Sequence, residues 1–177
     1  CFARAADGGR ELVLVTGYSG IGKTALVHEV HRPLASRQGQ FVEGKFDQFR
    51  RATPYSAVRE ALGALLLQRA GDSEDVRADL ALRLSDTLRS HLSAIATVLP
   101  EIVLLSGPLS PAPELFGDEA QERFRRAMRQ LVATLATASH PLVMFLDDLQ
   151  WIDAASLSLI DDLVRGSDIH HFLLVGA

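Results

Sequence analysis

The sequence predicts an α/β fold built around a parallel sheet. Two segments, residues 142–147 and 171–176, are apolar at nearly every position, as strands are when helices cover both faces of their sheet. Amphipathic helical segments separate the predicted strands, so the chain crosses over between strands instead of turning back in hairpins. With 177 residues, of which 47 % are hydrophobic, the chain is predicted to form a single domain over 1–177.

The first third of the chain predicts two strands with a helix between them. Residues 11–16 form a short apolar run that ends at a glycine, which favours a strand. A single helix is predicted over 22–36, with Leu26 on its buried face and with Pro33 ending or kinking it. A weaker strand follows at 41–46.

A helical insert is predicted over about 54–100, between the second and third strands. The helices expected within it cover 55–70, 75–89 and 91–99, with Pro100 stopping the last. Their spacing places Val76 on the buried face of the second helix. A proline-rich loop at 106–114 then leads to a long helix over 117–138, and a helix at 154–165 joins the last two strands.

Charge and cysteine content exclude several classes of protein. The 22 acidic and 18 basic residues give a net charge of −4, which argues against a protein that holds nucleic acid by bulk charge. No apolar run reaches the roughly 18 residues that a membrane-spanning helix needs. The one cysteine, Cys1, cannot form a disulfide within the chain, which fits a reducing cytoplasm. Because the chain starts with that cysteine and stops on a buried strand, we expect it to be a piece of a longer protein.

A glycine-rich stretch after the first strand matches the phosphate-binding pattern G-x-x-x-x-G-K-[ST] in full. It reads Gly17-Tyr18-Ser19-Gly20-Ile21-Gly22-Lys23-Thr24, and with Ala25 these are the predicted nucleotide-binding residues. The glycines let main-chain N–H groups close around a phosphate, and the following helix directs the positive end of its dipole at the same anion. Lys23 supplies a charge for the β- and γ-phosphates, and the Thr24 hydroxyl is a ligand for Mg²⁺. The alternative is a glycine-rich turn with a solvated lysine.

Two aspartates end the apolar strand at 142–147. Because the carboxyl ends of parallel strands meet at one edge of a sheet, this end is expected beside the phosphate-binding loop. Asp147 is predicted to hold Mg²⁺ through water, and Asp148 to orient or deprotonate the water that attacks the γ-phosphate. Catalysis is therefore assigned to Asp148 and Lys23. An ordinary strand-to-loop turn, where aspartate is common, is the alternative.

Lysine is rare in this chain, since only Lys23 and Lys45 occur among the 18 basic residues. Lys45 stands at the end of the second predicted strand, beside Asp47. Two interpretations are open for it. It forms a salt bridge at the strand end, or it makes a contact near the nucleotide or a neighbouring module.

Missing motifs exclude several classes of nucleotide-binding protein. Asp147 is not followed by the D-x-x-G pattern of GTPases, and the guanine-reading motif N-K-x-D does not occur. Neither the L-S-G-G-Q signature of transporter ATPases nor the H-R-D catalytic loop of protein kinases is present. The class that remains has a strand inserted between the two strands of the phosphate site.

Several segments together resemble the AAA-type STAND ATPase module. They are residues 17–24, Gly44-Lys45-Phe46-Asp47-Gln48-Phe49, Pro54-Tyr55-Ser56-Ala57, and 145–153 with Ser156-Leu157. The sequence is similar in particular to the ATPase segment of bacterial multidomain proteins that combine a serine/threonine kinase, an ATPase and a sensor histidine kinase. The resemblance implies a P-loop NTPase three-layer sandwich with the strand order 5-1-4-3-2, whose fifth strand would lie beyond residue 177.

The same resemblance implies ligands, partners and a function. ATP and Mg²⁺ are the expected ligands, and the expected partners are ATP or ADP, other domains of the same polypeptide and, if the module self-associates, a second copy. Neither nucleic acid nor a membrane is expected as a partner. The implied function is a nucleotide switch in signal transduction with slow ATP hydrolysis, because Asp148 stands where many such ATPases have the longer glutamate. A scaffold that binds ATP without hydrolysing it, and a phosphotransferase acting on a small molecule, stay open as alternatives.

Overall fold

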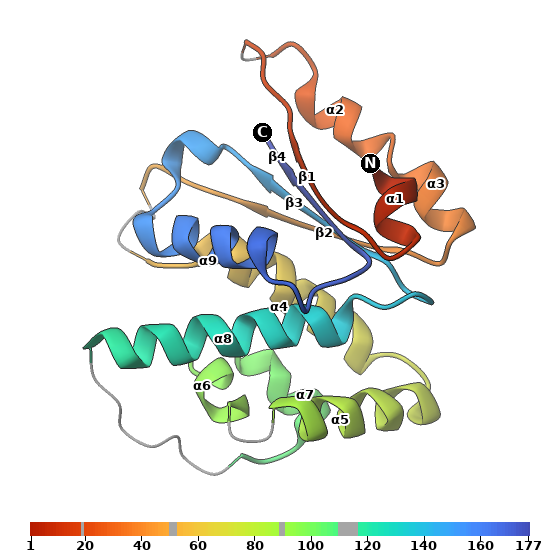
Figure 1. Ribbon diagram of the computed structural model, residues 1–177, viewed down its shortest axis with the longest axis vertical. Coiled ribbons are helices and arrows are strands. Elements are labelled where there is room, and N and C mark those ends of the chain that lie inside the picture. Colours follow the sequence, from red (N-terminus) through yellow and green to blue (C-terminus); the bar gives the residue numbers. More distant parts are fainter. Residues whose placement is uncertain (19, 50–52, 89–90, 110–116) are drawn as a thin grey trace.

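Four parallel strands form the centre of the molecule (Figure 1). The computed structural model describes residues 1–177 apart from 19, 50–52, 89–90 and 110–116. The strands are β1 (Arg10–Leu14), β2 (Gln40–Lys45), β3 (Leu142–Asp147) and β4 (Phe172–Gly176). They lie in the order β1-β4-β3-β2, which confirms the order predicted for the first four strands.

Helices lie on both sides of the sheet and give the molecule three layers (Figure 1). One side carries α1 (Phe2–Ala6), α2 (Lys23–His28) and α3 (His31–Ser36). The other side carries α4 (Ser56–Ala70), α5 (Glu74–Leu88), α6 (Leu92–Ala96), η1 (Pro100–Ile102), α7 (Val103–Ser106), α8 (Gly117–Leu135) and α9 (Ala154–Arg165). A single turn, η2 (Leu149–Trp151), joins β3 to α9. The predicted α/β class and its layered arrangement are confirmed.

Alternation along β3 divides the apolar core into two parts. Val143 and Phe145 pack with Val27 of α2 on one side of the sheet. Met144 and Leu146 belong to the larger cluster on the other side, which includes the buried residues of α4, α5, α8 and α9. Because helices cover both of its faces, β3 is apolar at every position before its carboxyl end.

The strand register brings several predicted site residues to one edge of the sheet. Lys45 at the end of β2 lies opposite Asp147 at the end of β3, and Gly176 of β4 lies opposite Leu14 of β1. A Cβ at Gly176 would stand 2.4 Å from Cδ1 of Leu149, so the glycine lets the turn after β3 pack closely over the sheet end. The loop after β1, Lys45 and the two aspartates therefore share this edge, as predicted.

The prediction of one helix over 22–36 is wrong. The chain forms α2 and α3 instead, and the interruption begins at Glu29. Pro33 lies in the first turn of α3, and a proline ring in a continuous helix would clash with the carbonyl four residues earlier, which is that of Glu29. Leu26 is 65 % exposed instead of buried, because α2 turns Val27 toward the sheet.

The helical region between β2 and β3 continues past its predicted stop. Pro100 begins η1, and α7 follows directly, because a proline fits the first turn of a helix, where its missing N–H needs no partner. Part of the predicted loop at 106–114 lies outside the described residues, from 110 onward. Val76, predicted to be buried, is 47 % exposed. The other leucines predicted on the inner faces of these helices are buried: Leu80, Leu84 and Leu88 of α5, Leu62, Leu65 and Leu66 of α4, and Leu131 and Leu135 of α8.

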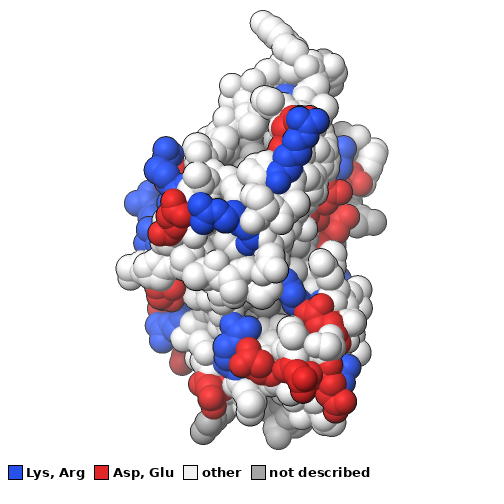
Figure 2. All heavy atoms as spheres, turned by 90° about the vertical axis from the view of Figure 1, so that its right-hand side faces the viewer, with Lys and Arg blue, Asp and Glu red and all other residues white. Residues whose placement is uncertain are grey.

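Charged side chains of both signs are mixed over the face shown in Figure 2. Ion pairs among the described residues include Arg4 with Glu11 at 2.6 Å and Arg37 with Asp7 at 3.2 Å. Exposed ion pairs of this kind contribute little to stability. Because each pair joins opposite charges, the surface around it has no strong electrostatic potential of one sign. Among the described helices, none has both the length and the apolar character needed to cross a membrane.

Candidate nucleotide-binding site

The loop between β1 and α2 has the backbone that a phosphate-binding loop needs. Gly20 and Gly22 have φ angles of 80° and 94°, a left-handed conformation that strains residues carrying a Cβ. Tyr18 and Ile21 are 88 % and 67 % exposed, so the loop is open to solvent. Ser19, also predicted to bind the nucleotide, lies outside the described residues.

Lys23 folds back over this loop at the start of α2. Its Nζ donates to the carbonyl of Gly17 at 3.1 Å and to that of Tyr18 at 3.4 Å. A Cβ at Gly17 would stand 3.0 Å from Cγ2 of Ile21 and 3.8 Å from Cδ of Lys23, so glycine keeps the loop narrow. Ala25 lies in the first turn of α2, whose leading N–H groups have no partner within the helix. The ammonium group and the start of α2 thus meet at the loop.

Thr24 and Asp147 lie side by side although they are far apart in sequence. The Thr24 hydroxyl donates to Oδ2 of Asp147 at 3.4 Å. Thr24 belongs to the first turn of α2 and Asp147 is the last residue of β3, so the parallel sheet brings the two together at its carboxyl edge. A hydroxyl and a carboxylate are hard oxygen ligands of the kind that Mg²⁺ prefers.

Two donors hold the carboxylate of Asp148. Gln150 donates from Nε2 to Oδ1 at 2.8 Å, and Nζ of Lys45 lies 3.1 Å from Oδ2. Burial raises the pKa of Asp148, but the hydrogen bonds from Gln150 and Lys45, with the charges of Lys45 and Lys23, outweigh it and lower the pKa. The backbone of Asp148 has a φ of 58°, which aspartate tolerates better than most residues. Asp148 is therefore a fixed carboxylate at neutral pH.

Lys45 forms a strand-end salt bridge, which is one of its two predicted interpretations, but its partner is Asp148 and not the neighbouring Asp47. The register explains the choice, because Lys45 lies opposite Asp147 and its side chain reaches the residue just beyond β3. The hydrogen bond to Asp148 and its charge, followed by the charges of Asp147 and Asp47, raise the pKa of Lys45. The sequence signals for Lys45 were the rarity of lysine and its place in the segment 44–49 that resembles the family, whereas Gln150 was included only as part of the segment 145–153.

A polar hollow of about 480 Å³ opens beside Asp148. Its lining includes Lys45, Asp47, Glu60 and Trp151, so one cation stands among several carboxylates. Trp151, in the turn η2, is half-buried and packs against the main core cluster, which holds this turn on the sheet. The hollow gives solvent access to the carboxylate of Asp148.

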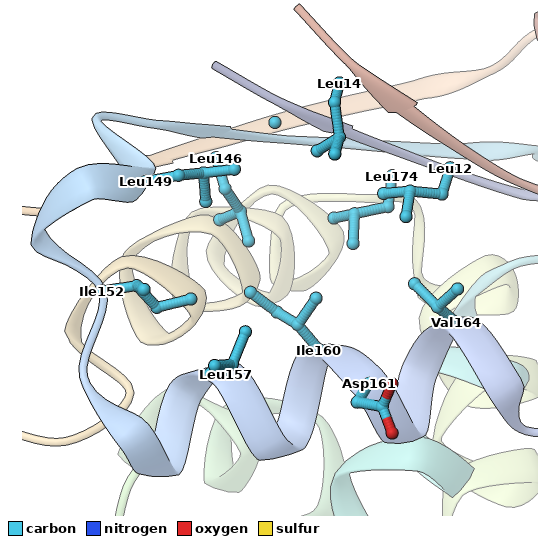
Figure 3. A pocket seen from close by; sticks show the side chains of 11 residues that line it. Leu12, Leu14, Leu146, Leu149, Ile152, Leu157, Ile160, Asp161, Val164 and Leu174 are labelled. Atoms are coloured by element: carbon cyan, nitrogen blue, oxygen red, sulfur yellow. The ribbon is translucent and has the colours of Figure 1, made fainter.

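A second hollow, of about 380 Å³, is apolar and lies between β1 and α9 (Figure 3). Leu12 and Leu14 of β1 point toward it from the sheet, and Leu157 and Ile160 of α9 line its other side. Among the described residues of 17–24, none lines this hollow. An apolar lining does not provide the charged and hydrogen-bonding groups that a triphosphate needs. The candidate nucleotide site is therefore the loop after β1 and not this hollow.

The residues at the loop fit a triphosphate bound with Mg²⁺. Lys23 and the main chain of the glycine loop suit phosphate oxygens, and the oxygens of Thr24 and Asp147 suit the metal ion. In the described parts of the chain, no group of three or more His, Cys, Asp or Glu side chains is arranged to hold a metal ion.

Comparison with known proteins places this chain in a family. Residues 1–175 match the family model described as AAA ATPase domain. Hybrid signal transduction histidine kinase G of Dictyostelium discoideum is 36 % identical over 167 residues, which cover 93 % of this chain and 5 % of that protein. Histidine protein kinase 1 of Candida albicans (strain SC5314 / ATCC MYA-2876) is 23 % identical over 170 residues, covering 88 % of this chain and 7 % of that protein. The chain thus spans only a small part of the length of these relatives. With the family model matching nearly every residue, the chain belongs to the AAA ATPase domain family.

Proposed function

We propose that this domain binds ATP with Mg²⁺ and hydrolyses it slowly, as a nucleotide switch within a larger signalling polypeptide. The observation that carries the proposal is the approach of the Thr24 hydroxyl to the Asp147 carboxylate, 3.4 Å apart, beside the loop that Lys23 closes. Membership of the AAA ATPase domain family supports nucleotide binding. The signalling context is supported by the two histidine kinases that the chain resembles.

Lys23 would carry much of the binding of the triphosphate. Its ammonium group donates to the carbonyls of Gly17 and Tyr18. Charged phosphate oxygens are stronger acceptors than carbonyls, so we expect Lys23 to turn to the β- and γ-phosphates when ATP is present. A compact ammonium group suits this narrow loop better than the planar fork of an arginine.

Thr24 and Asp147 would hold Mg²⁺ through a hydroxyl and a carboxylate oxygen. When bound, the ion neutralises charge on the β- and γ-phosphates during phosphoryl transfer. Thr24 lies in α2 and Asp147 in β3, so a bound ion would link these two elements.

Asp148 would orient the attacking water. Phosphoryl transfer depends mainly on positioning and electrostatic stabilisation, so a fixed carboxylate with a lowered pKa suits an acceptor that aligns water. Aspartate is one methylene shorter than the glutamate of many such ATPases, so its reach toward the water is shorter. We therefore propose slow turnover, which suits a switch whose two states must persist.

The partners follow from this function. We propose ATP and ADP as ligands, the other domains of the same polypeptide as the parts that the switch controls, and a second copy where the domain self-associates. The small share of each relative that the chain covers supports the presence of other domains in proteins of this kind. The motif resemblance supports the STAND grouping and a role in bacterial signalling. The single cysteine supports a cytoplasmic location.

Binding measurements combined with single-turnover hydrolysis test the proposal. With γ-labelled ATP and Mg²⁺, we expect the wild-type protein to bind ATP and to release free phosphate slowly, and Lys23→Ala to abolish binding. Binding without phosphate release would replace the hydrolytic switch with a scaffold that only holds ATP. Label found on a small molecule would identify a phosphotransferase, and equal binding by wild type and Lys23→Ala would overturn the proposed site.

A further inference from the structure

The outer edge of β2 has main-chain groups that no strand pairs with. β2 stands at one end of the sheet, and the N–H of Gln40 donates toward β3, to the carbonyl of Pro141 at 2.8 Å. Main-chain groups of successive residues in a strand point to opposite edges, so those of Phe41 and Glu43 point away from β3. Within the described ranges, neither of these two N–H groups has a hydrogen-bond partner in the protein. Such an edge is a template for a further strand.

A hollow of about 250 Å³ runs along this edge and is called the edge hollow below. Three consecutive residues of β2 line it, Phe41, Val42 and Glu43, and their side chains alternate between the two faces of the sheet. One hollow can touch both faces only where it passes around the edge of the sheet. Its other lining residues belong to the helices on the two sides: His28, His31, Ala64, Leu65 and Gln68.

The walls of the edge hollow are formed by packed side chains. On the side of α2 and α3, the ring centroid of His31 lies 4.4 Å from that of Phe41 and 5.4 Å from that of His28. Nδ1 of His28 and Nε2 of His31 are 3.2 Å apart, which is hydrogen-bonding distance. On the side of α4, Leu65 is buried in the core, and Ala64 is exposed and small. Rings and core residues that are already packed lose little freedom when a ligand binds.

Glu43 gives the edge hollow a negative charge. Its side chain is 60 % exposed, and its Oε2 lies 3.7 Å from Nε2 of His28, which carries a charge only when it is protonated. Neither lysine nor arginine occurs among the described residues that line the hollow. A lysine or arginine side chain of a ligand would therefore find an accessible carboxylate beside the unpaired main-chain groups of β2.

We propose that the outer edge of β2 binds an extended peptide that carries a lysine or arginine and adds a strand to the sheet. The main chain of the peptide bonds to the outward groups of Phe41 and Glu43, and its cationic side chain pairs with the carboxylate of Glu43. The edge hollow is smaller than the range of about 300–1,000 Å³ typical of small-molecule sites, so it suits a short extended segment better than a compact ligand. The proposal does not depend on nucleotide binding.

Binding of fluorescein-labelled pentapeptides to the protein without nucleotide tests the proposal. The probes have the sequence Thr-Val-Xaa-Val-Thr, which favours an extended chain, with Lys, Arg, Ala or Glu at the centre. We expect the Lys and Arg peptides to bind about fivefold more tightly than the Ala peptide, and the Glu peptide to bind most weakly. Glu43→Gln should make the Kd values of the Lys and Ala peptides equal. A Lys peptide methylated at every main-chain nitrogen should not bind, because it cannot donate to the strand edge.

Two variants of α4 locate the binding site. Ala64→Phe places a ring in the edge hollow from an exposed position and should abolish binding of the Lys peptide. Leu67→Phe is the matched control, because Leu67 is 54 % exposed on the same helix and does not line the hollow, so its Kd should equal that of wild type. Circular dichroism checks that both variants are folded. The Lys peptide should also slow hydrogen exchange of residues 41–43 in wild type.

Several results would overturn the proposal. They are an absence of binding by the Lys and Arg peptides, equal affinities of wild type for the Lys and Glu peptides, and unchanged binding by folded Ala64→Phe. A dimer of the peptide-free protein that Ala64→Phe dissociates, measured by sedimentation, would assign the edge to a second copy of the chain instead. Because ATP is absent from every one of these measurements, failure of the proposed nucleotide site would not change their results.

Discussion

The hydroxyl of Thr24 donates to a carboxylate oxygen of Asp147 at 3.4 Å, and this contact joins the start of α2 to the end of β3. Thr24→Val and Asp147→Asn should each lower the affinity for ATP in the presence of Mg²⁺, because the first change removes a hydroxyl ligand and the second removes the negative charge of a carboxylate ligand. The loss of a charge-assisted contact corresponds to roughly 10- to 100-fold in Kd. Titration of ATP with Mg²⁺ and with a chelator measures the effect.

The dependence on the metal ion distinguishes a ligand from a merely structural residue. Affinity measured in the chelator should be nearly the same for the wild type and both variants. Thr97→Val is a matched control, because the Thr97 hydroxyl donates to the carbonyl of Ala94 at the end of α6, in the helical region between β2 and β3. Equal losses with and without Mg²⁺ would mean that Thr24 and Asp147 do not hold the ion.

Asp148→Asn should reduce hydrolysis and leave ATP binding intact. The change removes the negative charge that Lys45 pairs with and weakens the acceptor proposed to align the water. Positioning groups of this kind contribute about 100-fold or more to the rate, so single-turnover phosphate release should slow by that order. Asp161→Asn serves as the control, since Asp161 pairs with Arg165 on the exposed part of α9. Unchanged release in Asp148→Asn would remove Asp148 from the mechanism.

Gly44→Ala should destabilise the protein strongly. The added Cβ would stand 1.9 Å from the carbonyl oxygen of Ala57, and backbone must shift to accept it. Overpacking against backbone costs about 3 kcal/mol, which urea unfolding would detect. Gly71→Ala, whose nearest atom is a carbonyl oxygen at 3.3 Å, should change the free energy of unfolding by less than about 0.5 kcal/mol. Similar stabilities of the two variants would show that β2 and α4 do not approach this closely.

His140 should make stability depend on pH in the mildly acidic range. Burial, followed by the charges of Arg69 and Arg83, lowers the pKa of His140 in the folded protein, with an opposing contribution from Asp72. The unfolded chain keeps a pKa near 6.5, so it binds more protons than the folded one at lower pH. The stabilisation is therefore complete above about pH 6.5 and is lost as the pH falls below that value.

His140→Gln tests this dependence. Urea unfolding between about pH 7.5 and about 5.5 should give a flatter pH profile for the variant than for wild type. Some slope should remain, because burial and the charges of Arg123 and Arg126 lower the pKa of His91 in the same direction. Parallel profiles for wild type and His140→Gln would contradict the assignment.

The sequence predicts the architecture well because its signals are local. Strands with both faces buried, such as 142–147, are apolar throughout, and glycines that require a left-handed backbone identify the loop after β1. The strand order came from the family resemblance and is confirmed. Helix ends were less predictable, because Pro33 interrupts a helix four residues before itself whereas Pro100 begins a new turn.

Contacts between distant segments were harder to predict. The pairing of Lys45 with Asp148 depends on the register of β2 against β3. The alternation of side chains along a strand does not specify which residues of the two strands lie opposite each other. The hydroxyl of Ser156 accepts a hydrogen bond from the backbone N–H of Tyr55, a group that every residue except proline carries and that no sequence pattern marks. Site residues carried by a local motif could therefore be predicted, and those defined by tertiary contact could not.

Equilibrium binding of ATP to wild type and to Lys23→Ala, each with and without Mg²⁺, tests the central claim most directly. Lys23 is the charged group that closes the loop, so the variant should lose measurable binding while its folded structure, checked by circular dichroism, is retained. Wild type should bind ATP more tightly with Mg²⁺ than without it. Equal affinities for wild type and Lys23→Ala, or no binding by a folded wild-type protein, would contradict the account.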